Sequence, residues 1–222
     1  KYIKIFDINF IDSNFKNIKS ILDKGGLLVL PSGPGLATIK SDFRYYKALK
    51  NADLVLFDSG YLCLLLRFLK NIKVQKFSGY KFLNIFFNQF DKIKQKKIYL
   101  IEPSIHIKKI NRKYLKNNNI NKIYQYTAPI YKKNKIYDYK LLKEIKKIKP
   151  KYIIINLGGG TQEVLGLYLK QNLSYKPSII CSGAAISFLT NQQAPINNLF
   201  DKLYLSWLVR IIFDPKQFLP RY

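Results

Sequence analysis

Short apolar runs alternate along this chain with amphipathic stretches of helical period, and this alternation restricts its fold more than any other feature. The runs are nearly continuous in Ile, Leu, Val and Tyr, as in parallel strands that are buried on both faces. Repeated strand–helix alternation predicts an α/β protein with a Rossmann-like, mostly parallel sheet. The expected strands are Tyr2–Phe6, Leu27–Leu30, Leu54–Phe57, Ile98–Ile101, Lys122–Tyr126, Tyr152–Leu157 and Ser178–Cys181. The expected helices are Asn14–Asp23, Asp42–Lys50, Tyr80–Gln95, Lys108–Asn117, Tyr139–Ile148 and Gln162–Gln171.

The length of 222 residues fits one large domain or two small, closely packed ones. A Lys-rich stretch, Lys92–Lys97, predicts a boundary between an N-terminal α/β half, residues 1–95, and a C-terminal half, residues 96–195. The remaining residues, 196–222, are expected to form an aromatic, basic helix followed by a tail. The chain begins at Lys1 and contains no Met, so we expect its native start to be missing.

The chain is strongly basic, with 39 Lys and Arg against 13 Asp and Glu and a formal net charge of +26. Such an excess predicts an anionic partner: nucleic acid, a membrane surface or a phosphorylated substrate. The richness in Ile, Lys, Asn and Tyr is also what AT-rich coding would produce. The charge alone therefore does not identify the partner.

Cysteine and histidine are too scarce for several kinds of chemistry. Cys63 and Cys181 show no disulfide framework or metal-ligand spacing, which fits a reducing compartment. The single histidine, His106, has no adjacent acid, and we expect it to be structural or exposed to solvent rather than part of a triad. No signal peptide is visible, and no apolar run approaches the roughly 20 residues of a membrane span.

Turn-forming and polar residues follow the expected strands, at the edge where open α/β sheets bind ligands. Gly158–Glu163 follows one strand and opens a helix, so its backbone N–H groups could bind an anion. It matches neither the P-loop nor the dinucleotide-binding pattern, and a simple tight turn is the alternative. Asp58 ends another strand, where it could accept a proton from a hydroxyl or merely cap the next helix. Pro31–Gly35 could wrap a substrate or form a structural turn.

Taken in order, several segments resemble motifs of the WecB/TagA/CpsF family of bacterial glycosyltransferases, glycosyltransferase family 26. The resemblance covers nearly the whole chain. The family's strand ending in Asp-Gly is similar to Leu54–Gly60, and its Gly-x-Pro-x-Gln-Glu signature is similar to Gly158–Glu163. The remaining similar segments are Lys76–Gly79, Gln193–Pro195, Ser206-Trp207 with Arg210, and Pro215 with Arg221-Tyr222.

The resemblance implies an inverting, metal-independent transfer of an N-acetylhexosamine or uronic acid from a UDP-sugar to a polyprenyl-diphosphate-linked sugar, in cell-surface polysaccharide synthesis. Asp58 would be the general base and Gln162 would contact the substrate. Lys76, Arg210 and Arg221 would stabilise the departing diphosphate. The other expected substrate-binding residues are Ser32, Gly33, Gly159, Gly160, Thr161 and Gly183. The enzyme would need no cofactor beyond the UDP-sugar co-substrate, and it would act in the cytoplasm on the inner face of the cell membrane.

Three positions depart from the family pattern. Pro31–Pro34 replaces Thr-x-Asn-Pro, Lys76 replaces an Arg that could pair bidentately, and Gln193 replaces the Arg before Ala-Pro. Two alternatives therefore stay open: a basic nucleic-acid-binding protein, although common nucleic-acid motifs are missing, and an inactive, family-like scaffold. The oligomeric state is open as well.

Overall fold

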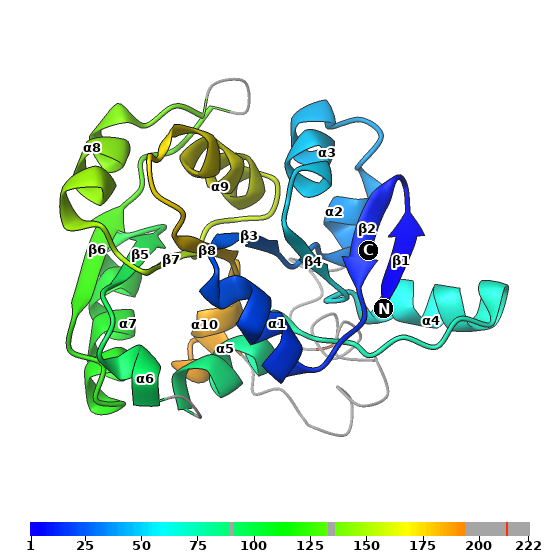
Figure 1. The fold of residues 1–222 in the computed structure, drawn as a ribbon, viewed down its shortest axis with the longest axis horizontal. Helices are drawn as coiled ribbons and strands as arrows, with labels where there is room; N and C mark the ends of the chain where they lie inside the picture. The colour runs from blue at the N-terminus through cyan, green and yellow to red at the C-terminus, as the bar shows by residue number, and fades with distance from the viewer. Residues whose placement is uncertain (89–90, 133–135, 194–211, 213–222) are drawn as a thin grey trace.

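A single sheet of eight strands runs through the molecule in the order β1-β2-β4-β3-β8-β7-β5-β6 (Figure 1). The computed structural model describes residues 1–88, 91–132, 136–193 and 212. The strands are β1 (Tyr2–Ile5), β2 (Ile8–Ile11), β3 (Gly26–Val29), β4 (Leu54–Leu56), β5 (Ile98–Glu102), β6 (Ile123–Thr127), β7 (Tyr152–Ile155) and β8 (Ser178–Cys181). All pairings are parallel except that of β1 with β2. The expectation of a mostly parallel α/β sheet is confirmed.

The continuous apolar runs are the strands at the centre of the sheet. Every residue of β3, β5, β7 and β8 is buried, because helices cover both faces of these strands. Strands from residues 1–95 occupy one side of the sheet and those from residues 96–195 the other, joined by the parallel pairing of β3 with β8. The division into two halves stays a prediction.

The helices form a layer on each face of the sheet (Figure 1). On one face, α3, α8 and α9 bury Leu49, Leu141 and Leu165 in one core cluster. On the other, α1, α5 and α7 bury Ile18, Phe82 and Leu115 in a second cluster. The bounds are α1 (Phe15–Asp23), α2 (Gly33–Ala37), α3 (Phe43–Lys50), α4 (Gly60–Lys70), α5 (Gly79–Asn88), α6 (Asp91–Lys94), α7 (Ile105–Asn117), α8 (Tyr139–Ile148), α9 (Thr161–Asn172) and α10 (Ala185–Leu189).

Four elements were not expected from the sequence: β2, α2, α4 and α10. The turn before β2 contains no glycine and is made by Phe6 and Asp7, both with positive φ, so no usual hairpin signal precedes it. Helix α4 has the mostly apolar sequence GYLCLLLRFLK, in which helical periodicity is hidden. The helix expected over Tyr80–Gln95 is two helices, α5 and α6.

Candidate active site

Asp58 follows β4 and is tied to a helix that begins 21 residues later. Its Oδ1 accepts a hydrogen bond of 2.9 Å from the backbone N–H of Gly79, the first residue of α5. The cap of the helix that directly follows, α4, is Ser59, whose side chain accepts a hydrogen bond from the Leu62 N–H. Asp58 therefore does not supply the N-cap of α4, but it binds the first N–H of α5, the next helix expected from the sequence. A carboxylate at the N-terminus of α5 is favoured by the helix dipole.

Gly79 lies where the ends of three strands converge. A Cβ at Gly79 would come within 3.0 Å of the Ala185 side chain and 3.5 Å of the Ser182 carbonyl, which follow β8. It would also lie 3.8 Å from Leu30, at the end of β3. The bond to Gly79 thus places the Asp58 carboxylate beside the loops that follow β3 and β8.

The structure places Lys76 in the neighbourhood of Asp58. The segment Lys76–Gly79 returns to β4 through a 2.8 Å bond from the Phe77 N–H to the Phe57 carbonyl. Burial raises the pKa of Cys63 to about 12, while the Lys76 charge lowers it and the Asp58 charge raises it. Both charged groups therefore act on the same buried thiol of α4.

The glycine-rich loop after β7 is held by an acid and an amide from the first turn of α9. The buried Glu163 accepts hydrogen bonds from the Gly160 N–H at 2.7 Å and from the Gln162 side-chain amide at 3.0 Å. The Gln162 Oε1 accepts a bond of 2.6 Å from the Gly183 N–H, in the loop after β8. Gly160 and Gly183 both have positive φ, a conformation that strains other residues.

Burial sets the ionisation of Glu163. Removal from water raises its pKa from 4.5 to about 7, against the lowering effect of the backbone N–H groups and of Gln162. Gln162 was expected to contact substrate, and in the structure it is buried, with both ends of its amide bonded to protein. It links the loops that follow β7 and β8.

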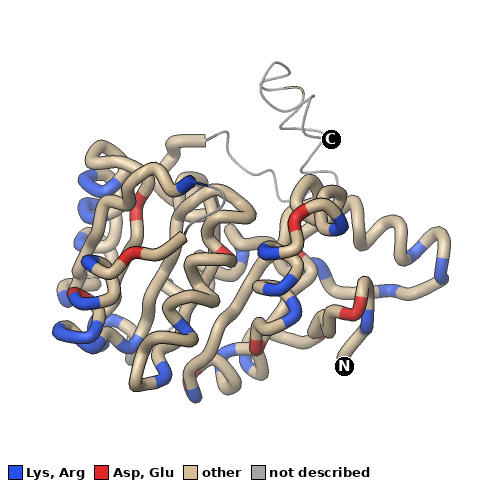
Figure 2. The backbone as a smooth tube through the Cα atoms, turned by 90° about the horizontal axis from the view of Figure 1, so that it is seen from above, with Lys and Arg blue, Asp and Glu red and all other residues tan. Residues whose placement is uncertain are grey.

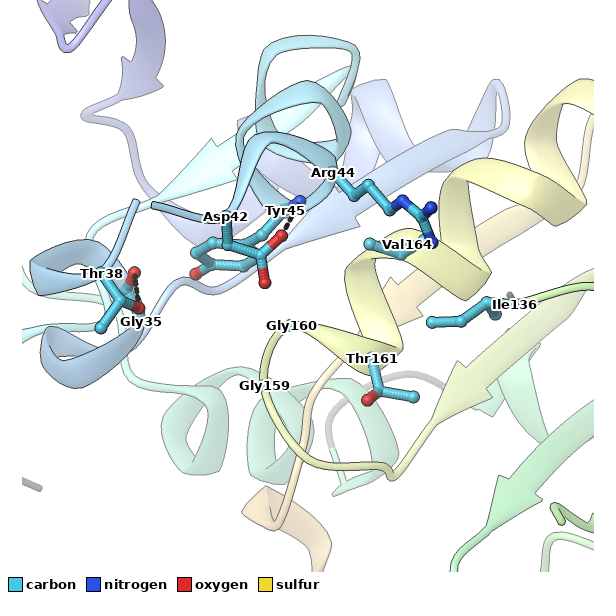
Figure 3. Close-up of a pocket in the computed structure, with 10 residues that line it drawn as sticks. All are labelled: Gly35, Thr38, Asp42, Arg44, Tyr45, Ile136, Gly159, Gly160, Thr161 and Val164. Atoms are coloured by element: carbon cyan, nitrogen blue, oxygen red, sulfur yellow. Dashed lines mark hydrogen bonds between the residues drawn. The ribbon is translucent and has the colours of Figure 1, made fainter. Parts of the chain in front are cut away.

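A cleft of about 140 Å³ lies between the loop at the start of α9 and the segment that contains α2 and α3 (Figure 3). The expected residues Gly159, Gly160 and Thr161 line it. Ser32 lies close by: its Oγ would be 3.9 Å from a Cβ on Gly159, and it accepts a bond from the Gly35 N–H. The other lining residues are Gly35, Thr38, Asp42, Arg44, Tyr45, Ile136 and Val164. Gly33 is the first residue of α2, next to this group.

Arg44 and Tyr45 are cleft residues that the sequence analysis missed. Arg44 stands in the first turn of α3, where the helix dipole disfavours a cation. This unusual position is the sequence feature that could have identified it as a cleft residue. The Tyr45 hydroxyl lies against Gly35, where a Cβ would come within 2.7 Å. Burial and the charges of Glu163 and Asp58 raise the pKa of Tyr45 well above its usual value, so it stays neutral.

A buried polar network lies behind the loop after β8. The Ser182 hydroxyl donates to Asn156 at 3.1 Å, and the Asn156 and Asn111 amides donate to the Glu102 carboxylate at 3.0 and 2.9 Å. Burial raises the pKa of Glu102, and its amide partners lower it. The network ties the ends of β5, β7 and β8 together and fixes Ser182, the neighbour of Gly183. Sequence reasoning did not identify Asn156 or Asn111.

Other expected features have separate outcomes. Arg210 and Arg221 lie outside the described residues, as do Pro195 and Trp207. His106 is exposed on α7, away from any triad. Within residues 1–88, 91–132 and 136–193, no cluster of three His, Cys, Asp or Glu side chains could hold a metal ion. In the same part of the chain, no helix has the length and apolar character needed to cross a membrane.

Lys and Arg are spread over the elements at both ends of the sheet rather than gathered in one stripe (Figure 2).

Comparison with known proteins supplies the family. No curated protein matches the chain. The sequence model of the glycosyl transferase WecG/TagA/CpsF family matches residues 3–222, which is essentially the whole chain. The protein whose Asp58, glycine-rich loop and cleft share one edge of the sheet therefore belongs to the WecG/TagA/CpsF family and is a glycosyltransferase, which supports a role in cell-surface polysaccharide synthesis.

Proposed function

We propose that this glycosyltransferase moves a sugar of the N-acetylhexosamine or uronic acid type from a UDP-sugar to a polyprenyl-diphosphate-linked acceptor, with inversion and without a metal. The observation that carries the proposal is the placement of Asp58. Its carboxylate is anchored by Gly79 at the same sheet edge as the cleft and the glycine-rich loop. A half-buried carboxylate at the carboxyl edge of a parallel sheet, where open α/β proteins bind ligands, has a position from which it could act as a general base.

In the proposed reaction, Asp58 takes the proton of the acceptor hydroxyl. The acceptor oxygen then bonds to the anomeric carbon of the donor, and the bond from that carbon to the diphosphate oxygen breaks. The bond from the Gly79 N–H stabilises the ionised form of Asp58, the form that can accept the proton. Inversion follows because attack and departure take place on opposite faces of the sugar.

The diphosphate of the donor requires neutralisation as it leaves. In this proposal, Arg44 and the N-terminus of α9 contact it from the cleft, and Lys76 approaches from the side of Asp58. The cleft volume of about 140 Å³ accommodates part of a UDP-sugar, so the rest of the donor would extend past the loop after β8. Arg210 and Arg221 would contribute from outside the described residues.

A lipid-linked acceptor requires the enzyme to work at a membrane surface. We propose a peripheral position on the inner, cytoplasmic face of the cell membrane. The net charge of +26 supports this proposal because the anionic lipids of such a surface attract Lys and Arg.

The test combines ligand binding with turnover. Thermal unfolding is measured with UDP, other nucleoside diphosphates and a panel of UDP-sugars, and products formed from a short-chain polyprenyl-diphosphate-linked sugar are identified by mass spectrometry. Stabilisation by UDP, together with a product heavier by one sugar, supports the proposal. No response to any nucleotide, with salt-sensitive binding to RNA or DNA instead, would reject it in favour of a nucleic-acid-binding protein.

A further inference from the structure

The last turn of α4 is exposed on every side. All five residues from Arg67 to Asn71 are exposed, although Cys63 and Leu66 of the same helix are buried. Lys70 lies two turns after Cys63 and hence on the same helix face, yet it is in solvent. The helix therefore extends past the described body of the protein, as its position at one end of the molecule shows (Figure 1).

This projecting turn exposes large apolar side chains beside cations. Phe68 and Leu69 are each 77% exposed, and Tyr61 at the start of the helix is 51% exposed. Arg67 and Lys70 flank the pair, and Lys73 follows in the next segment. Interfacial anchors typically combine adjacent exposed apolar side chains at the end of a helix with flanking cations. The apolar groups enter the lipid, and Lys or Arg bind the headgroups.

The charge of the surrounding sequence selects an anionic surface. From Ser59 to Phe90 the chain has no acidic residue and five cations, which are Arg67, Lys70, Lys73, Lys76 and Lys81. Figure 2 shows Lys and Arg positions at the outer end of α4 and in the segment that follows it. Each Lys or Arg close to an anionic leaflet strengthens binding by about fivefold.

Helix α4 also connects this anchor to the proposed base. It begins at Gly60, two residues after Asp58. At the α-helical rise, Phe68 lies about 12 Å along the axis from the start of the helix. With the outer turn in the headgroup region, the start of α4 beside Asp58 would lie close to the layer where the diphosphate of a polyprenyl-linked acceptor resides.

We propose that the outer turn of α4, with Phe68 and Leu69 inserted and Arg67, Lys70 and Lys73 on the headgroups, docks the protein on an anionic bilayer. The proposal rests on the lipid-linked acceptor of the proposed function. It assigns membrane contact to the helix that begins two residues after the proposed base. At 11 residues, α4 is too short to span a bilayer, so it enters the surface only.

The experiment is sedimentation of the full chain with vesicles of phosphatidylglycerol and phosphatidylcholine, compared with phosphatidylcholine alone. The apolar variant is Phe68→Ser/Leu69→Ser. Its matched control is Ile105→Ser/Tyr139→Ser, which removes two side chains that are 64% and 78% exposed on α7 and α8. The charge variant is Arg67→Gln/Lys70→Gln, and its control is Lys143→Gln/Lys146→Gln on α8, at the other end of the sheet.

We expect the wild type to bind only the anionic vesicles. The apolar variant should bind at least about tenfold more weakly, because two apolar side chains no longer leave water. The charge variant should bind about tenfold or more weakly, and both controls should bind like the wild type. Equal losses in the α8 charge control would indicate diffuse attraction and overturn the proposal, as would wild-type binding to neutral vesicles or undiminished binding of the α4 variants.

Two further measurements test whether the outer turn of α4 contacts this chain or a second copy of it instead of a bilayer. A fall in thermal stability of the α4 variants with unchanged vesicle binding would mean that the turn packs against this chain. A change from oligomer to monomer with unchanged vesicle binding would assign it to a second copy, and either result overturns the proposal. The stabilisation by UDP is recorded for each variant, so that loss of docking with a normal UDP response is distinguished from failure of the proposed function.

Discussion

The Asp58 carboxylate accepts a 2.9 Å hydrogen bond from the backbone N–H of Gly79, so the end of β4 and the start of α5 are fixed to each other. Gly79 is in turn packed against the loop after β8 through Ala185 and Ser182. One carboxylate thereby organises the edge of the sheet where the glycine-rich loop and the cleft lie. The bond to Gly79 therefore allows the structural role of Asp58 to be separated from its proposed chemical role.

Asp58→Asn should lower the turnover rate by about 100- to 10,000-fold, the usual contribution of a general base. The Asn side-chain oxygen can still accept the Gly79 N–H, so the melting temperature should change little. Turnover is followed as sugar transfer, and folding by thermal unfolding. Asp58→Ala serves as the control, because it removes the acceptor as well and should also lower stability. Near-normal turnover in the Asn variant would exclude Asp58 as the base.

Arg44→Gln should weaken UDP binding by roughly tenfold or more, because a hydrogen bond to a charged group in the cleft is lost. The measurement is calorimetric titration with UDP. Arg112→Gln, an equal change of charge at an exposed position of α7, should leave the affinity unchanged. The same loss in both variants would show that only the overall charge matters and that Arg44 does not contact the nucleotide.

Glu163 should make stability depend on pH. Its pKa is about 7 in the folded protein and 4.5 when it is not buried, so the unfolded chain releases this proton first as the pH rises. The free energy of unfolding should therefore fall between about pH 4.5 and pH 7, by roughly 3 kcal/mol from this group. Urea unfolding across this range, compared with Glu163→Gln, isolates the effect, since the amide does not titrate. Parallel curves for the two proteins would contradict the prediction.

Gly166→Ala should destabilise the protein although Ala is the better helix former. A Cβ at Gly166 would come within 2.7 Å of Leu27 and 2.9 Å of Cys181, so α9 would be pushed off the sheet. We expect a loss of about 1–3 kcal/mol in urea unfolding. Gly158→Ala is the control, since a Cβ there meets nothing within 4 Å. An unchanged or higher stability of the Gly166 variant would show that the contact with the sheet relaxes freely.

The apolar runs determined the fold class by themselves. Strands buried on both faces must be almost wholly apolar, and this local requirement made β3, β5, β7 and β8 visible in the sequence. Elements whose formation depends on distant contacts were not visible. Helix α4 lacks a clear period, and β2 becomes a strand only by pairing with β1 and β4.

The sequence also determined which loops carry the candidate site, because glycines and polar residues after strands are local features. Only the tertiary structure decided what those residues contact. Asp58 binds Gly79 instead of capping α4, Gln162 bridges two loops, and Arg44 lines the cleft. These partners are separated by many residues and meet only because parallel strands align their carboxyl ends, a relationship that local sequence does not encode.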